Sequence, residues 1–321
     1  MPIEVLKPGL STTVQDVGRL GYYNVGIPPS GALDLFSLIA ANLLVGNDRG
    51  AAALECAYMG PELRFGEPGV VAVTGAELEP RVNGEPREAW SSFGVQTGDV
   101  LSFGHVKRGA RMYIGVGGGI DVPVKLESRS TYVLGALGGH QGRPLAEGDQ
   151  LPVGPAAKAT HGSVPEHLRP AMPKELEIRV VTGLYDHLLT DAGRATFFDT
   201  DWTLTPVADR VGFRYKGEKL DLVKRKQPFG AGSDPSNIVD SPYPIGSIQI
   251  PGGVEPIVLH RDAVSGGGYA MIATVISADM DTVAQSAPGS KTRFVPVELD
   301  DALAARAERS ERLRDLETAL A

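Results

Sequence analysis

Short strand-like segments separated by glycine and proline recur along most of this 321-residue chain, and their spacing restricts the fold more than any other feature. Residues 175–180 alternate charged and apolar side chains, as in a strand with one buried face. Strands that arrive about every 8 to 12 residues favour β-barrels or sandwiches over alternating strand–helix units. We therefore expect a mainly β protein. The other strand candidates are residues 70–73, 100–103, 112–116, 246–250, 256–259 and 272–276.

Two segments predict helices instead. Residues 33–45 repeat apolar side chains at helical spacing, and the same holds for the end of the chain, from about residue 300 to residue 320. We expect Ser30 to cap the first of these helices and Asp34 to lie in its first turn, where a carboxylate meets the positive end of the helix dipole. Gly46 and Asn47 provide a stop for it.

The segment from Pro155 to Pro173 holds four prolines and shows no periodicity, as is typical of a linker or a long surface connection. It divides the chain into two β-rich parts of similar size. We expect an N-terminal β domain over residues 1–155, a C-terminal β domain over residues 174–298 and a C-terminal helix over residues 299–321.

Charge and composition exclude several classes of protein. The net charge of −8 disfavours nucleic acid or an anionic membrane as the main partner. No apolar run reaches the roughly 18 to 20 residues of a transmembrane helix, and the first residues do not resemble a signal peptide. The single cysteine, Cys56, fits a small buried residue in a reducing compartment, so we expect a cytoplasmic protein.

Motifs for several kinds of chemistry are missing from the sequence. There is no phosphate-binding Gly-x-x-x-x-Gly-Lys-Ser/Thr loop. The glycine runs 117–119 and 266–268 fit no dinucleotide fingerprint, and we expect tight turns at barrel edges there. The six histidines lack the spacing of a zinc site, so no metal is expected.

The first concentration of candidate site residues lies in a loop rich in glycine and proline, just ahead of the helix predicted at 33–45. Backbone amides at a helix start favour anions, and an arginine offers a planar fork of donors for a carboxylate. An alternative is that Asp16 and Arg19 only brace the loop. The candidates here are Gln15, Asp16, Arg19, Ser30 and Asp34.

A second concentration lies on a proline-stiffened loop and strand late in the chain. Polar side chains held on stiff loops above a β scaffold are typical of binding sites, although asparagine and aspartate also serve turns alone. Arg210 is a weaker candidate, because an aspartate–arginine pair beside a turn glycine is also a common brace. The other candidates here are Asn237, Asp240, Tyr243 and Gln249.

Long motifs resemble a known family. Residues 8–19 (PGLSTTVQDVGR) and 26–34 (GIPPSGALD) closely resemble the signature of the KipA family, also called allophanate hydrolase subunit 2 and the C-type subunit of 5-oxoprolinase, with a biotin-dependent carboxyltransferase-like domain. The resemblance continues in order through residues 41–47, 128–132, 209–213 and 266–269 and so spans nearly the whole chain. It implies two cyclophilin-like β-barrel domains with a few short helices and a C-terminal helix.

The resemblance also implies partners and a reaction. Family members pair with a KipI-like subunit (allophanate hydrolase subunit 1, the B-type subunit of 5-oxoprolinase). The pair commonly joins a third, A-type subunit to hydrolyse 5-oxoproline with ATP. We therefore expect a subunit of an ATP-dependent hydrolase of a cyclic amide, with ATP bound mainly on a partner. Asp16, Arg19 and Asp240 are the expected catalytic residues; Gln15, Ser30, Asp34, Arg210, Asn237, Tyr243 and Gln249 are expected to bind the substrate.

Two other functions within this resemblance stay open. One is a carboxyltransferase subunit that moves a carboxyl group from carboxybiotin to urea or a similar amide. That module usually carries a histidine where this chain has Val239, which favours the 5-oxoprolinase branch, whereas Tyr243 and residues 245–246 are similar to the carboxylase side. The other is a regulator that binds a KipI-like kinase inhibitor without catalysis.

Overall fold

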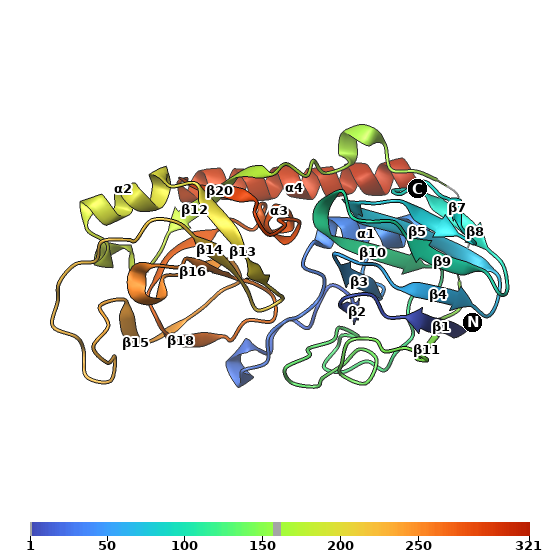
Figure 1. Ribbon diagram of the computed structural model, residues 1–321, viewed down its shortest axis with the longest axis horizontal. Coiled ribbons are helices and arrows are strands. Elements are labelled where there is room, and N and C mark those ends of the chain that lie inside the picture. Colours follow the sequence, from blue (N-terminus) through green and yellow to red (C-terminus); the bar gives the residue numbers. More distant parts are fainter. Residues whose placement is uncertain (1, 157–161) are drawn as a thin grey trace. The chain divides into compact units, whose positions relative to one another are not determined.

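The computed structural model describes residues 2–156 and 162–321 (Figure 1). The chain divides into two compact units. The first consists of residues 1–20, 30–172 and 311–321, and the second of residues 21–29 and 173–310. The long segment of the second unit begins at Pro173, where the predicted linker ends. The second unit also includes residues 21–29, and the C-terminal helix is divided between the units at residues 310 and 311. Residues 157–161 of that linker lie outside the described residues.

The first unit is built from two sheets. One has the strand order β11-β1-β4-β9-β6-β7 and the other β2-β3-β10-β5-β8. The strands are β1 (Pro2–Lys7), β2 (Thr12–Gln15), β3 (Ala53–Ala57), β4 (Glu62–Phe65), β5 (Gly69–Glu77), β6 (Pro80–Val82), β7 (Glu85–Pro86), β8 (Ser92–Val95), β9 (Val100–Phe103), β10 (Arg108–Val116) and β11 (Gln150–Pro152).

Apolar side chains from both sheets form one core in this unit. Ile3 and Leu101 come from the first sheet, and Val73 and Ile114 from the second; all four are fully buried. Alternation along each strand directs these side chains to one face of its sheet. The helix α1 (Leu35–Leu44) packs on β5 and β10, and it places its apolar stripe in a separate core cluster.

The start of α1 differs from the prediction. Asp34, not Ser30, is the capping residue, since its carboxylate accepts hydrogen bonds from the Ser37 amide at 2.9 Å and the Ser37 hydroxyl at 2.6 Å. Ser30 lies four residues earlier with a left-handed backbone (φ 52°) and is too far along the chain to cap. The predicted stop is confirmed, because Gly46 takes the left-handed conformation directly after the cap residue Val45.

The second unit holds a closed barrel with the strand order β12-β19-β16-β17-β14-β13-β20. Its neighbours are antiparallel, except that β12 and β20 run parallel. The buried ring of Phe294, from β20, stacks on that of Phe197 with centroids 5.1 Å apart, and Phe197 also lies beside the buried Trp202 of β13. The barrel strands are β12 (Glu175–Thr182), β13 (Trp202–Ala208), β14 (Gly212–Lys216), β16 (Ser247–Gln249), β17 (Ile257–Leu259), β19 (Met271–Val275) and β20 (Lys291–Pro296). The mainly β prediction is confirmed.

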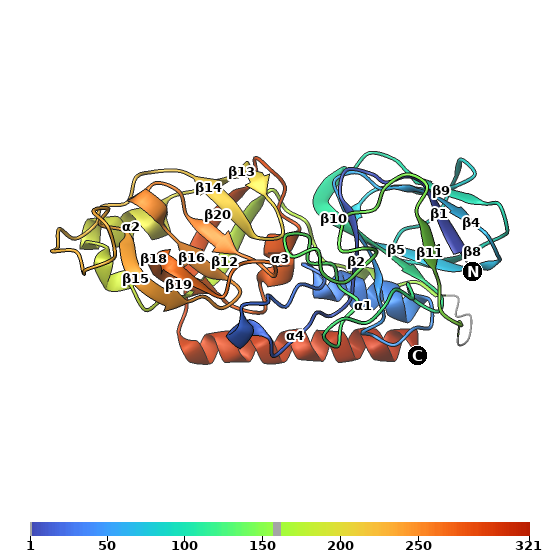
Figure 2. The same cartoon turned by 90° about the horizontal axis from the view of Figure 1, so that it is seen from below.

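A two-stranded sheet in this unit, β15 (Asn237–Pro242) and β18 (Gly266–Tyr269), lies beside the barrel strands (Figures 1 and 2). The expectation of a tight turn at residues 266–268 is wrong, because these glycines form β18. A Cβ on Gly266 would lie 3.1 Å from the Ser241 carbonyl oxygen, and one on Gly267 3.1 Å from the Tyr243 ring. Close approach of β15 and Tyr243, rather than a turn, therefore explains the glycine run.

Among the described residues, the other α-helices are α2 (Asp191–Asp199), α3 (Met280–Ala284) and α4 (Leu299–Leu320). The predicted C-terminal helix is therefore confirmed. Its last turns contribute the buried Leu313 and Leu316 to the core cluster of the first unit that also contains Val164 and Leu168. None of the helices in the described residues is both long enough and apolar enough to cross a membrane.

Candidate functional site

Three of the predicted site residues come together in the second unit, around β15 and β18. The side chain of Asp240 is exposed on β15, and the Tyr243 ring lies under β18 beside Gly267. Gln249 and Asp240 both act on the pKa of the Tyr243 phenol, which Gln249 lowers and the Asp240 charge raises. Of the three, only the Asp240 carboxylate faces solvent, and a carboxylate can exchange a proton with a bound molecule; Tyr243 and Gln249 are buried.

Tyr243 is fixed firmly in this cluster. Its hydroxyl donates to the Tyr269 carbonyl oxygen at 2.7 Å and accepts from the Tyr269 amide at 2.8 Å. Burial raises the pKa of the Tyr243 phenol, and its hydrogen bonds with Tyr269 and Gln249 offset part of that rise. The phenol therefore stays neutral at physiological pH and acts as a hydrogen-bonding group.

Asn237 opens β15, four residues before the serine that faces Gly267. Its backbone carbonyl oxygen accepts a hydrogen bond from the Arg225 side chain at 2.6 Å, and its backbone N–H donates to the Asp234 carbonyl oxygen at 3.0 Å. These contacts fix the backbone at the start of the strand that carries Asp240.

Arg210 forms a two-pronged ion pair with Asp262. Its Nε and Nη2 donate to the two carboxylate oxygens at 2.8 and 3.2 Å, and both side chains are largely buried. Its sequence neighbour Asp209 instead accepts hydrogen bonds from the Val211 and Gly212 amides and closes the turn before β14. The bidentate geometry is that of a strong brace between two segments of the second unit.

In the first unit, Asp16 is the centre of a buried hydrogen-bond network. One of its carboxylate oxygens accepts from the Gly18 amide and from the hydroxyls of Ser128 and Ser130, and the other accepts from the Arg129 amide. The carboxylate is 6% exposed and accepts four hydrogen bonds. These hydrogen bonds connect Asp16 to residues that lie more than 110 positions away in the chain.

Arg19 and Gln15 belong to the same buried region. The Arg19 guanidinium, 1% exposed, donates to the Ser130 carbonyl oxygen, and a Cβ on Gly138 would lie 2.7 Å from its Nη2. The Gln15 amide donates to Thr131 and accepts from the Gly31 amide. Both side chains join the loop that contains Ser30 to the segment 128–139, which is a bracing geometry.

A second buried network was not anticipated from the sequence. The Glu55 carboxylate, 4% exposed, accepts from the Leu33 amide at 2.8 Å and from the Tyr113 hydroxyl at 2.7 Å. The same hydroxyl accepts from the Asp34 amide at 2.9 Å. Burial, followed by the charges of Glu55 and Asp34, raises the pKa of Tyr113. The signal in the sequence was a charged residue inside the apolar run 52–57, where a buried carboxylate needs donors.

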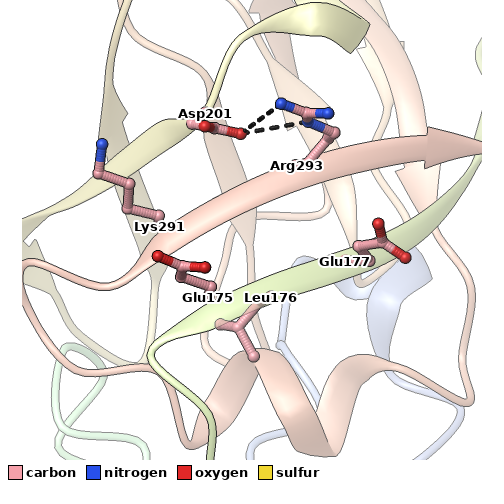
Figure 3. A pocket seen from close by; sticks show the side chains of 6 residues that line it. All are labelled: Glu175, Leu176, Glu177, Asp201, Lys291 and Arg293. Carbon is pink, nitrogen blue, oxygen red and sulfur yellow. Dashed lines mark hydrogen bonds and ion pairs between the residues drawn. The ribbon is translucent and has the colours of Figure 1, made fainter.

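A shallow pocket of about 460 Å³ lies elsewhere in the second unit, over β12 and β20 (Figure 3). Its lining is mostly charged, and Arg293 pairs with Asp201 at 2.8 Å. Glu175 stands directly opposite Lys291 in the parallel strand pair, and Glu177 opposite Arg293. The pocket is therefore lined by exposed pairs of opposite charge on neighbouring strands, and these side chains do not point toward one common spot. In the part of the chain that the structure describes, no group of His, Cys, Asp or Glu side chains is arranged to hold a metal ion.

A family model described as "Carboxyltransferase domain, subdomain A and B" matches residues 25–296. The chain belongs to this carboxyltransferase family. The match includes β15, β18 and the whole barrel of the second unit, so every candidate residue there lies within the carboxyltransferase region.

Relatives in this carboxyltransferase family differ in how much of their own length the chain covers. The chain is 34% identical to the C-type subunit of 5-oxoprolinase from Escherichia coli over 95% of its own length and 94% of that protein. It is 36% identical to urea amidolyase of Lachancea kluyveri over 92% of its length but only 17% of that protein. The crystal structure of the Kluyveromyces lactis urea carboxylase matches 98% of the chain at 34% identity, with a TM-score of 0.93, across 29% of that protein. The chain thus spans a small part of the large urea-converting relatives.

Proposed function

We propose that the chain is the C-type subunit of an ATP-dependent 5-oxoprolinase, which opens 5-oxoproline to glutamate together with a KipI-like, B-type partner and an A-type partner. The observation that carries this proposal is Val239 on β15, which stands where the urea carboxylase module usually carries a histidine; the 34% identity to the C-type subunit of 5-oxoprolinase from Escherichia coli supports it. Sequence identity alone does not separate this function from carboxyl transfer, because the urea amidolyase match is as high.

The reaction adds water across the ring amide of 5-oxoproline and leaves an amine and a second carboxylate. The amide is stabilised by resonance, so ATP is needed to activate it. The sequence has no phosphate-binding loop of the Gly-x-x-x-x-Gly-Lys-Ser/Thr type, and we assign ATP mainly to one of the partners. The chain's own residues then hold and orient the substrate.

Among the candidate residues, Asp240 is the one best placed for proton transfer. Its carboxylate faces solvent, whereas both oxygens of Asp16 are engaged in hydrogen bonds inside the first unit. Tyr243 and Gln249 are buried, and the Tyr243 hydroxyl is already bonded to Tyr269, so their part in the proposal is to support the sheet that carries Asp240. The role of Arg19 in binding the substrate carboxylate remains part of the proposal, with bracing as the competing role.

The test is reconstitution from the three purified proteins. Release of glutamate from 5-oxoproline should require ATP and all three of them. Asp240→Asn should lower kcat by about 100-fold or more, the usual contribution of a positioned acid or base. The matched control is Asp300→Asn, at the exposed start of α4, which should leave kcat unchanged. Full activity of Asp240→Asn would remove Asp240 from the mechanism.

A second candidate function is carboxyl transfer from carboxybiotin to urea or a related amide. It is favoured by the TM-score of 0.93 to the K. lactis urea carboxylase and by the description of the family model. In this case the purified chain, supplied with a biotin carboxylase and a carboxylated biotin carrier, should transfer labelled bicarbonate carbon to urea. No release of glutamate would accompany that transfer.

A further inference from the structure

A turn on the surface of the second unit presents a phenylalanine to solvent. Phe229 is 102% exposed, more than any other large apolar side chain in the described residues. Packing an aromatic side chain removes about 150–250 Å² of surface from water and stabilises the fold. The exposed Phe229 ring makes no such contribution. Scattered exposed apolar residues are normal on a folded protein, so exposure alone assigns no role to Phe229.

The turn that carries Phe229 is well defined. The Ala231 amide donates to the Pro228 carbonyl oxygen at 3.2 Å, and Gly230 has a φ of 91°, as the third residue of a type II turn requires. Ala231 is buried at 4% exposure and anchors the end of the turn. Because the backbone is already fixed, little further ordering is needed when Phe229 packs against a partner.

The segment just before this turn is net positive, unlike the protein as a whole. Residues 216–229 hold five basic and two acidic side chains, within a chain whose net charge is −8. Lys224 and Lys226 are exposed, while Arg225 is held by the Asn237 carbonyl oxygen. The Phe229 ring therefore follows a run of three consecutive basic residues, 224–226, of which the outer two face solvent.

We propose that the turn 228–231 and the basic run 224–226 form a docking surface for an acidic partner protein, with Phe229 as the anchor in an apolar socket of that partner. Exposed basic side chains three to five residues from an aromatic anchor favour acidic side chains on the partner, because unlike charges near a desolvated contact favour the correct partner and accelerate its approach. The inference rests on the proposed function: the partner is a further component of the proposed 5-oxoprolinase.

The anchor contact is tested by calorimetric titration of the full-length chain with the purified B-type partner and, separately, with the purified A-type partner. Phe229→Ser should weaken binding of one of them at least 10-fold without changing the melting temperature, since the ring packs against nothing in the chain. The matched control, Leu299→Ser, alters another exposed apolar side chain (62% exposed) in the same unit and should bind like the wild type.

The charged rim is tested by the double variant Lys224→Glu/Lys226→Glu. It should weaken the same interaction, and more strongly at 50 mM than at 500 mM salt, because salt screens exposed charges. This variant keeps Phe229 in place, so it tests the surface even if Phe229→Ser folds poorly.

Three outcomes would overturn the inference. If both variants bind each partner like the wild type while the mixture still releases glutamate, the surface has no docking role and the proposed function stands. If the wild-type chain binds neither partner and releases no glutamate with them, the proposed function fails and the inference with it. If sedimentation shows that the chain alone self-associates through Phe229, the occupant is a second copy instead.

Discussion

The hydroxyl of Tyr243 binds both backbone polar groups of Tyr269, donating to its carbonyl oxygen at 2.7 Å and accepting from its amide at 2.8 Å. One side chain thus satisfies the end of β18 and holds the sheet that carries Asn237 and Asp240. Tyr243→Phe leaves both backbone groups without this partner, so we expect a loss of about 1–3 kcal/mol in the free energy of unfolding. Urea denaturation and hydrogen exchange at β18 measure the effect.

The control for this prediction is Tyr269→Phe, which keeps the backbone groups and alters a side chain that is 44% exposed. It should change the free energy of unfolding by less than about 0.5 kcal/mol. Equal stability of Tyr243→Phe and the wild type would show that the sheet does not depend on this hydroxyl.

The stability of an Arg19 variant separates bracing from binding of the substrate carboxylate, and the buried contact with Ser130 favours bracing. Arg19→Ala removes a buried cation that donates to Ser130 in the network around Asp16, so the free energy of unfolding should fall by about 3 kcal/mol, with activity lost in parallel. Arg81→Ala, on an exposed arginine, is the control and should be neutral. Unchanged stability of Arg19→Ala with activity abolished would instead assign Arg19 to the substrate carboxylate.

Asp34 stabilises the start of α1. Asp34→Ala should cost about 1–2 kcal/mol in unfolding free energy, because the Ser37 amide and hydroxyl lose their acceptor. Asp34→Asn keeps an acceptor oxygen at the cap and should cost less. Thermal and urea unfolding of the two variants distinguish these effects, and equal losses would show that the charge matters more than the cap.

Cys56 should be unreactive in the folded protein. Burial raises the pKa of its thiol to about 12, and the reactive species is the thiolate. At pH 8 a thiol reagent such as a maleimide should modify the chain only as fast as the structure opens, whereas modification in guanidinium chloride should be immediate. Rapid modification of the folded chain would contradict the buried position of Cys56 in β3.

Asp149 should contribute to stability against acid. The hydrogen bond from Arg143 lowers its pKa from 3.8 to about 2. A lowered pKa stabilises the fold above the unfolded-state value and loses that contribution as the pH falls from about 4 to 2. Arg143→Met should therefore be about 1 kcal/mol less stable at pH 6, with the difference shrinking below pH 4, because Arg143 is partly exposed. A difference that does not depend on pH would contradict the ion pair.

Strand periodicity and glycine spacing predicted the fold class and seven of the strands (β5, β9, β10, β12, β16, β17 and β19), because one-sided burial leaves a period of two that is visible in the sequence. Residues 100–103 coincide with β9, and residues 175–180 lie within β12. The glycine run 266–268 was misinterpreted, because the neighbour that requires its missing side chains, Tyr243, lies more than 20 residues away in the chain.

The candidate site was only partly accessible from the sequence. Clusters of polar residues in loops were visible, but their partners were not: Asp16 is bound by Ser128 and Ser130, and Arg210 by Asp262, all from distant segments. Such partners are set by the tertiary fold, which local patterns do not encode. The exposed Asp240 and the buried Asp16 look equally suited to proton transfer until burial and hydrogen bonds are known.

The most direct test of the central claim assays one preparation of the chain in two separate reactions, one with 5-oxoproline and one with urea. Mixed with the B-type and A-type partners, ATP and 5-oxoproline, it should release glutamate, and omission of this chain should abolish that release. Mixed with a biotin carboxylase, a biotin carrier, ATP, labelled bicarbonate and urea, it should leave urea unlabelled. Labelled urea product without glutamate release would contradict the 5-oxoprolinase assignment and establish carboxyl transfer instead.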